Sequence, residues 1–260
     1  MSNIEIEDVG RVRIVRLAHE KPTNPVGKQT ALAFMAAMRD ADADENVGSV
    51  VVTGGENRCF SAGGDFNEAR MLSDDEIVND TIDWCTDLYL SVLNMSKPTI
   101  SAVDRHAVGL GFQLALMFDW KLMSTRADLF MPELEHGIGA SMGATIITTA
   151  CGYDVARHVV MSCRPIGPEE AMRLGMMDEV CEPEFLLDRA IQRANRMSRY
   201  PGIAFAATKK VLTEHMRRAL EDTRAASQHV HRESFRAKAM TKHFDNILGT
   251  VQETEVVSAG

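Results

Sequence analysis

The stretch that constrains the fold most reads SKPTISAVDRHAVGLGFQLALMFDWKLMS and covers residues 96–124. Its apolar run Thr99–Val103 predicts a buried strand. The Gly109-Leu-Gly triplet that follows predicts a turn opening an apolar helix through Phe118. A helix N-terminus presents free backbone N–H groups and a partial positive charge, although a Gly-x-Gly triplet alone also fits a packing turn. The stretch therefore predicts an α/β arrangement with a candidate anion-stabilising loop after a buried strand.

An earlier stretch has the same succession of strand and glycine loop. Ser49–Thr53 predicts a buried strand closed by Gly54-Gly55, and residues 60–66 then read FSAGGDF. Paired glycines let the backbone approach a ligand closely, although AGGD alone equally fits a tight turn. Because both loops follow buried strands, we expect them to converge and to offer two backbone N–H groups. Such a pair forms an oxyanion hole, which stabilises charge developing on a carbonyl oxygen, as in a thioester enolate.

Three further signals complete the predicted α/β core. A short strand pair turns at Gly10, helical apolar spacing covers Gly27–Ala43, and a capping box at Ser73–Glu76 opens a helix that runs to about Asn94. Short strands and helices then alternate to about Tyr200. Alternation of this kind is typical of an α/β domain.

The strand signals stop after Pro201. Helical spacing continues beyond it, broadly over residues 204–214 and 216–244. We therefore expect two parts: a core over residues 1–200, and a helical region over residues 201–260 that packs on the core or on a neighbouring subunit.

Composition and charge argue against several classes of function. The chain has 260 residues, 45% of them hydrophobic, and a formal net charge of −9. An acidic chain is a poor partner for nucleic acid, and no apolar run reaches the roughly 18 residues of a membrane span. The first residues lack the basic and apolar regions of a signal peptide. We therefore expect a cytoplasmic protein that binds neither nucleic acid nor membrane.

The cysteines and histidines give no metal pattern. The five cysteines are scattered and form no CxxC pair, which is typical of reduced, buried thiols in the cytoplasm. His229 and His231 lie two residues apart and would face different sides of a helix. We therefore expect no metal site.

Three segments together resemble a known superfamily. FSAGGDF at 60–66, the stretch 96–124 and MPELEHGIG at 131–139 resemble, in order and spacing, the signature segments of the crotonase (enoyl-CoA hydratase/isomerase) superfamily. The resemblance extends over nearly the whole chain. It implies the crotonase fold, an α/β spiral of repeated strand–strand–helix units with C-terminal helices that mediate a homotrimer or a dimer of trimers.

The same resemblance implies the ligand and the oxyanion donors. The substrate would be a coenzyme A thioester, with no tightly bound cofactor. The N–H groups of Gly64 and Leu110 would form the oxyanion hole. The coenzyme A site would include one early residue and the first loop, namely Val26, Ala62, Gly63, Gly64, Asp65 and Phe66.

Two positions of the superfamily's pattern distinguish its reactions. Hydratases of the superfamily place two glutamates around one water, whereas this chain has Gln113 at the first position and Glu133 at the second. A glutamine cannot accept a proton, so two-carboxylate hydration is disfavoured and Glu133 is the expected catalytic base. The alternatives without catalysis are a core or surface amide for Gln113 and a structural carboxylate at a helix entry for Glu133.

One subfamily fits these positions. FSAGGDFNE, VGLGFQLALMFD, MPELEHGIG and His229-Val-His231 resemble the carboxymethylproline synthases of carbapenem biosynthesis. The resemblance implies that malonyl-CoA is decarboxylated to an enolate, which adds to pyrroline-5-carboxylate, the cyclised form of glutamate semialdehyde, before the thioester is hydrolysed. His231 would be an active-site histidine of the C-terminal helix, and a histidine on that helix's surface is the alternative. Arg105 and Thr81 depart from the pattern, where glycine and an aromatic residue are expected.

Two other functions remain open. Another reaction of the superfamily, such as isomerisation, hydration, decarboxylation alone or thioester hydrolysis alone, is the first alternative. A non-catalytic binding protein on the same scaffold, such as the RNA-binding relatives, is the alternative from another class. The acidic balance and the intact glycine loops argue against it.

Overall fold

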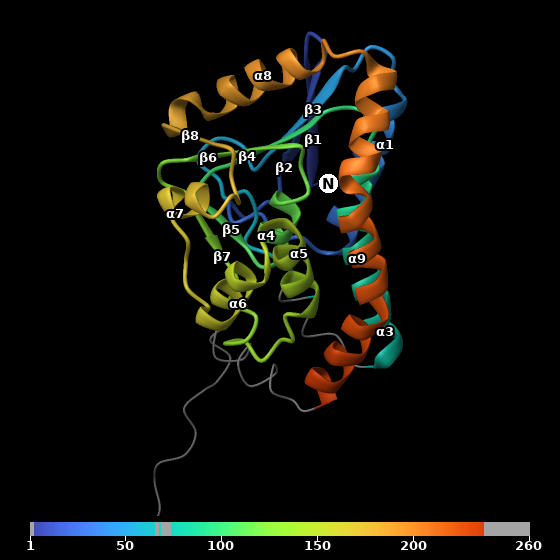
Figure 1. Ribbon diagram of the computed structural model, residues 1–260, viewed down its shortest axis with the longest axis vertical. Helices are drawn as coiled ribbons and strands as arrows, with labels where there is room; N and C mark the ends of the chain where they lie inside the picture. Colours follow the sequence, from blue (N-terminus) through green and yellow to red (C-terminus); the bar gives the residue numbers. More distant parts are fainter. Residues whose placement is uncertain (1–2, 66–67, 69–73, 237–260) are drawn as a thin grey trace, which may run out of the picture.

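The main sheet runs through the upper part of the molecule (Figure 1). The computed structural model describes residues 3–65, 68 and 74–236. The six strands lie in the order β1-β2-β3-β4-β6-β8, with β1 and β2 antiparallel and every other neighbouring pair parallel. The strands are β1 (Ile4–Val9), β2 (Val12–Leu17), β3 (Ser49–Thr53), β4 (Thr99–Val103), β6 (Trp120–Ser124) and β8 (Glu179–Cys181).

A second, smaller sheet forms the other strand layer of the repeated strand–strand–helix units. Strands β5 (His106–Val108) and β7 (Asp128–Phe130) pair in parallel. Single bridges extend this layer on both sides, joining Val26 to Gly64, Ser61 to Ala107 and Leu129 to Ile166. Strands β3, β4 and β6 are each followed by a segment of the second layer and then by a helix. The predicted spiral of strand–strand–helix units is therefore confirmed.

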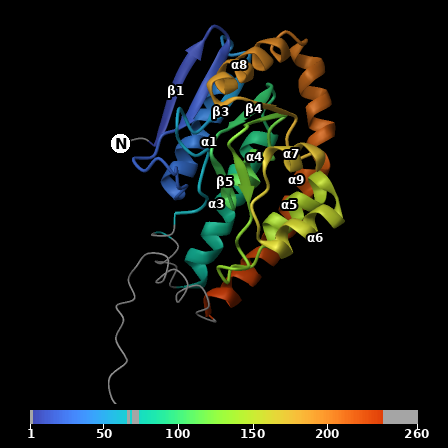
Figure 2. The ribbon, with the colours of Figure 1, turned by 90° about the vertical axis from the view of Figure 1, so that its left-hand side faces the viewer.

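Helices cover both faces of the main sheet (Figures 1 and 2). On one face, α8 buries residues that recur about every four positions, which is the apolar stripe of an amphipathic helix: Leu186, Ala190, Ala194 and Met197. These pack against Ile14, Val51, Ile100 and Leu122 of the strands. The helices are α1 (Lys28–Ala43), α3 (Asp75–Leu93), α4 (Leu110–Ala115), α5 (Ser141–Cys151), α6 (Tyr153–Ser162), α7 (Pro168–Arg173), α8 (Leu186–Met197) and α9 (Gly202–Arg236).

Three sequence predictions differ from the structure in detail. The C-terminal region forms one helix, α9, that continues across residue 215 instead of two separate stretches, because no glycine or proline interrupts it there. The predicted end near residue 244 lies outside the described residues. The N-cap of α3 is Asp74, whose carboxylate accepts from the Ile77 N–H at 3.0 Å, so the expected capping box at Ser73 is wrong by one residue. Helix α4 ends at Ala115, three residues before the predicted end.

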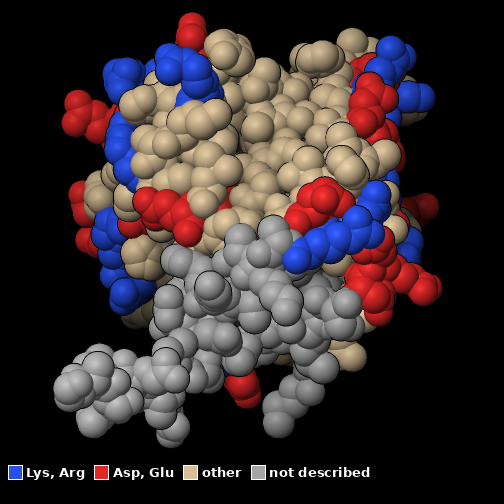
Figure 3. Space-filling view, turned by 90° about the horizontal axis from the view of Figure 1, so that it is seen from below, with Lys and Arg blue, Asp and Glu red and all other residues tan. Residues whose placement is uncertain are grey.

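A ladder of polar side chains joins α3 to α9. The α3 members are spaced by four residues, and so are their partners on α9, so that the two rows face each other along antiparallel helices. We call these residues the polar ladder: Asp75, Asn79, Asp83 and Asp87 on α3, and Arg224, Gln228, Arg232 and Arg236 on α9. Its side chains are close to solvent, and Figure 3 shows acidic and basic groups side by side at the edge where these helices lie.

No helix in the described part of the chain combines the length and the apolar character that crossing a bilayer requires.

Candidate active site

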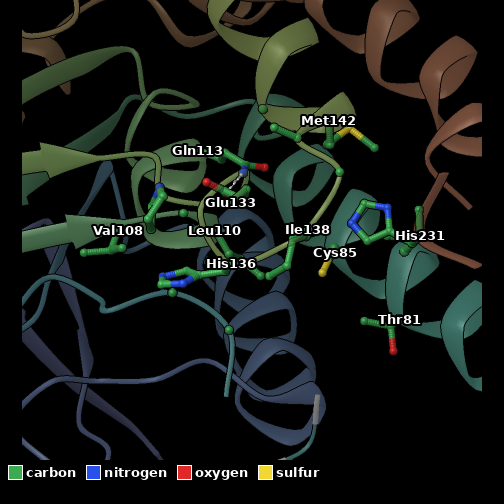
Figure 4. A pocket seen from close by; sticks show the side chains of 18 of the residues that line it. Thr81, Cys85, Val108, Leu110, Gln113, Glu133, His136, Ile138, Met142 and His231 are labelled. Carbon is green, nitrogen blue, oxygen red and sulfur yellow. Dashed lines mark hydrogen bonds between the residues drawn. The ribbon is translucent and has the colours of Figure 1, made fainter. Parts of the chain in front are cut away.

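A cavity of about 180 Å³ lies between the glycine loops and the α3–α9 pair (Figure 4). Its lining is mainly apolar, with a few polar groups that converge on it. Seven of the predicted site residues line it: Ala62, Gly63, Gly64, Leu110, Gln113, Glu133 and His231. Residues that are up to 169 positions apart in the sequence, from Ala62 to His231, therefore meet at one cavity.

The first loop pairs with Val26 through its backbone and leaves the N–H of Gly64 outside that pairing. The Val26 N–H donates to the Gly63 carbonyl at 2.8 Å, and the Asp65 N–H donates to the Val26 carbonyl at 3.1 Å. Successive N–H groups alternate in direction along an extended segment, so the N–H of Gly64 points away from Val26. A Cβ built on Gly64 would meet no atom of the described residues within 4 Å.

The second loop meets the first because Gly63 has no side chain. Gly63 has a φ of +96°, and a Cβ placed on it would lie 2.8 Å from the Val108 carbonyl oxygen and 3.8 Å from the Leu110 nitrogen. Leu110 is the first residue of α4, and the first main-chain bond of that helix runs from the Gln113 N–H to the Gly109 carbonyl at 2.9 Å. The N–H of Leu110 is therefore one of those that a helix leaves without an internal acceptor.

Glu133 follows the second-layer strand β7 and is held by the turn after it. The backbone carbonyl of Glu133 accepts from the N–H groups of His136 and Ile138. Its carboxyl Oε1 accepts from Gln113 Nε2 at 3.0 Å. Its Oε2 is buried and has no hydrogen-bond partner among the described residues. A buried carboxylate oxygen left in this state is a natural acceptor for a bound water or substrate group.

The electrostatic surroundings suit Glu133 to proton transfer near neutral pH. Burial raises the pKa of Glu133 to about 7, although hydrogen bonds from its own backbone and from the Gln113 amide act in the opposite direction. A carboxyl with this pKa exchanges protons readily at pH 7, as a general base must. The amide of Gln113 can donate to that carboxyl but cannot share its proton chemistry.

Tyr89 belongs to this group of side chains, and the sequence analysis missed it. Its hydroxyl donates to Gln113 Oε1 at 2.9 Å, so a hydrogen-bonded chain runs from Tyr89 through Gln113 to Glu133. The available signal was a tyrosine on the apolar face of a predicted helix, because a buried tyrosine hydroxyl requires a partner. Its partner could not be read from the sequence.

His231 lines the cavity from α9, opposite the glycine loops. Its Nδ1 lies 2.7 Å from the Ser227 carbonyl oxygen, which can only accept, so Nδ1 carries the hydrogen. Burial lowers the pKa of His231 below its usual value, despite that hydrogen bond. The ring is therefore neutral at pH 7, with its Nε2 lone pair available, and Figure 4 shows the ring at the edge of the cavity.

Of the remaining predicted residues, Val26 and Asp65 pair with each other through their backbones beside the first loop. Val26 is 2% exposed and contributes its backbone, which pairs with the first loop, while its side chain packs in the core. Asp65 adjoins the loop through its own N–H, and Phe66 lies outside the described residues. Thr81 lines the cavity, and its hydroxyl donates to the Ile77 carbonyl at 2.9 Å.

Arg105 stands outside the cavity lining at the start of β5. Its φ of +54° lies in the left-handed region, which explains why a glycine suits this position. Its Nε is buried without a hydrogen-bond partner among the described residues.

Within residues 3–65, 68 and 74–236, no group of three His, Cys, Asp or Glu side chains is arranged to hold a metal ion. The cavity lining combines the backbone of the two glycine loops with the Glu133 carboxyl, whose pKa is about 7, the neutral imidazole of His231, the imidazole of His136 and the Cys85 thiol.

Comparison with known proteins places these features in a family. The sequence profile of the enoyl-CoA hydratase/isomerase family matches residues 7–248. The chain is 42% identical to a carboxymethylproline synthase of Pectobacterium carotovorum subsp. carotovorum, over 94% of this chain and 97% of the relative. It is 30% identical to a probable enoyl-CoA hydratase of Rhizobium meliloti, over 91% and 90% of the two chains. The solved structure of ThnE from S. clavuligerus matches with a TM-score of 0.77 at 31% identity, covering 88% of this chain and all of that one.

Proposed function

The chain belongs to the enoyl-CoA hydratase/isomerase family, and from this premise we propose that it is a carboxymethylproline synthase-like enzyme. In this proposal it decarboxylates malonyl-CoA, adds the enolate to pyrroline-5-carboxylate and hydrolyses the resulting thioester. Coenzyme A enters as part of the substrate, and no tightly bound cofactor takes part.

The observation that carries the proposal is the pair formed by Gln113 and Glu133. A hydratase mechanism with two carboxylates needs a second group that can gain and lose a proton, and an amide cannot do so. Gln113 instead donates a hydrogen bond to Glu133, which leaves one carboxyl oxygen for one water. One base and two oxyanion donors match a reaction that ends in thioester hydrolysis.

The first two steps need charge stabilisation and no base. The bond between C2 of the malonyl group and its carboxylate breaks, CO₂ leaves, and the electron pair forms the thioester enolate. The N–H groups of Gly64 and Leu110 stabilise the negative charge on the enolate oxygen. C2 then attacks the imine carbon of pyrroline-5-carboxylate protonated at nitrogen, so a carbon–carbon bond forms and the ring nitrogen takes the imine electron pair to become a neutral amine.

The last step uses Glu133. Its carboxylate accepts a proton from water as the water oxygen attacks the thioester carbon. The same two N–H groups stabilise the tetrahedral oxyanion, which collapses to the free acid and expels the coenzyme A thiolate, and the thiolate takes up the proton. In this scheme Gln113 holds the base, and His231 faces the electrophile from the opposite wall.

The coenzyme A portion is assigned to the first loop. Ala62, Gly63 and Gly64 line the cavity, and Asp65 and Val26 extend the same backbone pairing, which supports an entry path along residues 62–65. We also assign Phe66 to this path from the sequence resemblance alone, because it lies outside the described residues. Binding of free coenzyme A by calorimetry, weakened in an Ala62→Trp variant, would support this path; equal binding by both proteins would contradict it.

The assembly and compartment are part of the proposal. We propose a homotrimer or a dimer of trimers, because α9 leaves large apolar side chains exposed: Ile203 at 92%, Val211 at 76% and Leu212 at 76%. Light scattering that returns the mass of a single chain would contradict it. The five cysteines are all free thiols, which supports a reducing compartment such as the cytoplasm.

The proposal is tested by product analysis. The protein is incubated with malonyl-CoA and pyrroline-5-carboxylate, and carboxymethylproline, CO₂ and free coenzyme A are measured by mass spectrometry and gas analysis. We expect all three in equal amounts. Hydration of an enoyl-CoA without any carboxymethylproline would overturn the proposal in favour of the hydratase activity that several relatives carry in their names.

A further inference from the structure

Tyr89 lies behind the proposed base, on the far side of Gln113. It is 1% exposed, and its hydroxyl is 2.9 Å from Gln113 Oε1. Burial raises the pKa of Tyr89 well above its usual range, so the hydroxyl keeps its proton throughout the neutral range. It is therefore a constant donor, whatever the protonation state of Glu133.

The hydroxyl determines which end of the Gln113 amide meets Glu133. A primary amide can present its carbonyl oxygen or its NH₂ group to a neighbour, and its hydrogen-bond partners select between them. With Tyr89 donating to Oε1, the NH₂ group faces Glu133. If the amide turned round, the Tyr89 hydrogen would lose its acceptor. Gln113 Oε1 would then face Glu133 Oε1, so two acceptors would meet without a hydrogen between them while Glu133 is ionised.

Apart from Tyr89 and Glu133, the neighbours of the Gln113 amide do not select between its two orientations. Met131 Sδ, 3.7 Å from Gln113 Nε2, is a weak acceptor. Gly143 of α5 packs tightly against this group, because a Cβ built on it would lie 2.1 Å from Met131 Cε and 3.1 Å from Gln113 Nε2. The amide therefore has two strong partners, Glu133 Oε1 at its nitrogen and the Tyr89 hydroxyl at its oxygen. A protonated Glu133 could donate to either end of a turned amide, so Tyr89 is the partner that holds the orientation in both protonation states of Glu133.

We propose that Tyr89 is a positioning residue of the hydrolysis step, which acts through Gln113 to keep Glu133 ionised and its Oε2 turned toward water. The inference rests on the proposed function, because it takes Glu133 as the base for hydrolysis. Tyr89 itself touches no reacting atom. Its loss should impair proton transfer and leave the enolate step, which depends on the donors of Gly64 and Leu110, nearly unchanged.

Other titratable groups face the same cavity and must be separated from Glu133 in any pH experiment. Cys85 of α3, His136 and His231 of α9 line it with Tyr89. Burial raises the pKa of Cys85 and lowers the pKa of His231, so both are neutral near pH 7. A His136→Asn variant, which has no imidazole at this position and keeps Glu133, is measured in parallel to identify any contribution from His136.

The kinetic test compares Tyr89→Phe with Tyr153→Phe, a matched change at a tyrosine that is 69% exposed. In Tyr89→Phe we expect hydrolysis to fall about threefold to tenfold at pH 7, and CO₂ release by less than about twofold. The midpoint of the hydrolysis pH profile should move upward by about half to one unit, because a turned amide favours protonated Glu133. Tyr153→Phe should match the unmodified protein. An unchanged midpoint in Tyr89→Phe would overturn the inference.

A double variant and an infrared titration remove the remaining ambiguity. If Tyr89 acts through the amide, adding Tyr89→Phe to Gln113→Met causes no further loss, and additive losses contradict the inference. The protonated-carboxyl band of Glu133, identified by its absence in Glu133→Gln, is then followed against pH without substrate. A shift of this band in Tyr89→Phe supports the inference even if malonyl-CoA is not turned over, in which case the proposed function alone fails. No shift refutes the role of Tyr89.

Discussion

The cavity has two walls that are held together differently. The inner wall consists of the two glycine loops with Gln113 and Glu133, and buried hydrogen bonds connect its parts. The outer wall consists of α3 and α9, and charged side chains near solvent connect the two helices. The inner loops approach so closely that a Cβ on Gly63 would lie 2.8 Å from Val108. The outer helices meet through the polar ladder, in which Arg224 is 2.7 Å from Asp87.

The two kinds of attachment differ in energy and in their response to solvent. Leaving a buried hydrogen-bonding group unpaired costs about 1–3 kcal/mol, while an exposed ion pair contributes about 0–1 kcal/mol and is screened by salt. The wall that would stabilise charge is therefore expected to be rigid and insensitive to salt. The wall that would enclose the second substrate is expected to tolerate change.

The largest effect is expected from Glu133→Gln on the inner wall. Hydrolysis should fall about 10²–10⁴-fold, because the base for water is lost, while part of the malonyl-CoA decarboxylation persists, because that step needs no base. Glu133→Asp should recover part of the hydrolysis, limited by its shorter reach. CO₂, coenzyme A and thioester products are measured separately.

Accumulation of acetyl-CoA or the carboxymethylprolyl thioester would confirm that the two steps are divided in this way. Equal loss of all three products would show that Glu133 supports the site as a whole. Unimpaired hydrolysis would assign the base to another residue, with His231 as the first to examine.

A nearly equal effect is expected from Leu110→Pro, which removes one oxyanion donor. Proline is tolerated at the first position of a helix, so α4 should still form. Turnover should fall about 10²–10³-fold in both the CO₂ and hydrolysis assays. Leu110→Met, which keeps the N–H, is the control and should lose little. A folded Leu110→Pro protein with full activity would remove Leu110 from the oxyanion hole.

A smaller effect is expected from pH. Hydrolysis needs ionised Glu133, whose pKa is about 7, so its rate should fall about tenfold between pH 8 and pH 6. Decarboxylation uses no base at Glu133 and should not follow this curve. Parallel pH profiles of CO₂ and coenzyme A release check the difference, and identical profiles for the two would contradict it.

The smallest effect is expected from the outer wall. Arg224→Met removes ion pairs to Asp83 and Asp87 and should lower the free energy of unfolding by about 1 kcal/mol or less at low salt. The deficit should shrink at high salt, where the charges are screened. Arg157→Met, at an exposed ion pair 3.9 Å long with Asp154, is the control. Denaturant titrations at two salt concentrations measure the effect, and a salt-independent loss would mean that packing, not charge, joins the helices.

The sequence determined more of the inner wall than of the outer wall. Glycines after buried strands predicted that the two loops would converge, and the structure shows Gly63 against Val108. The sequence also shows directly that residue 113 is a glutamine and residue 133 a glutamate. Residue type alone tells that Glu133 can act as a base and that the Gln113 amide cannot. By contrast, the helical spacing over residues 204–214 and 216–244 left open whether this region packs on the core or on a neighbouring subunit, and it did not identify α3 as the helix that α9 contacts.

Residue type, local spacing and turn chemistry are properties of the chain itself, and they determined the strands, the glycine loops and the chemical identity of Gln113 and Glu133. Only the tertiary structure decided that Tyr89, 24 residues before Gln113, would orient its amide, and that Glu133 Oε2 would be left without a partner. The physical reason is that a hydrogen bond between distant elements depends on which helix faces meet. The pKa of Glu133 near 7 has the same origin, because burial is produced by the packed elements around the carboxyl and not by its neighbours in sequence.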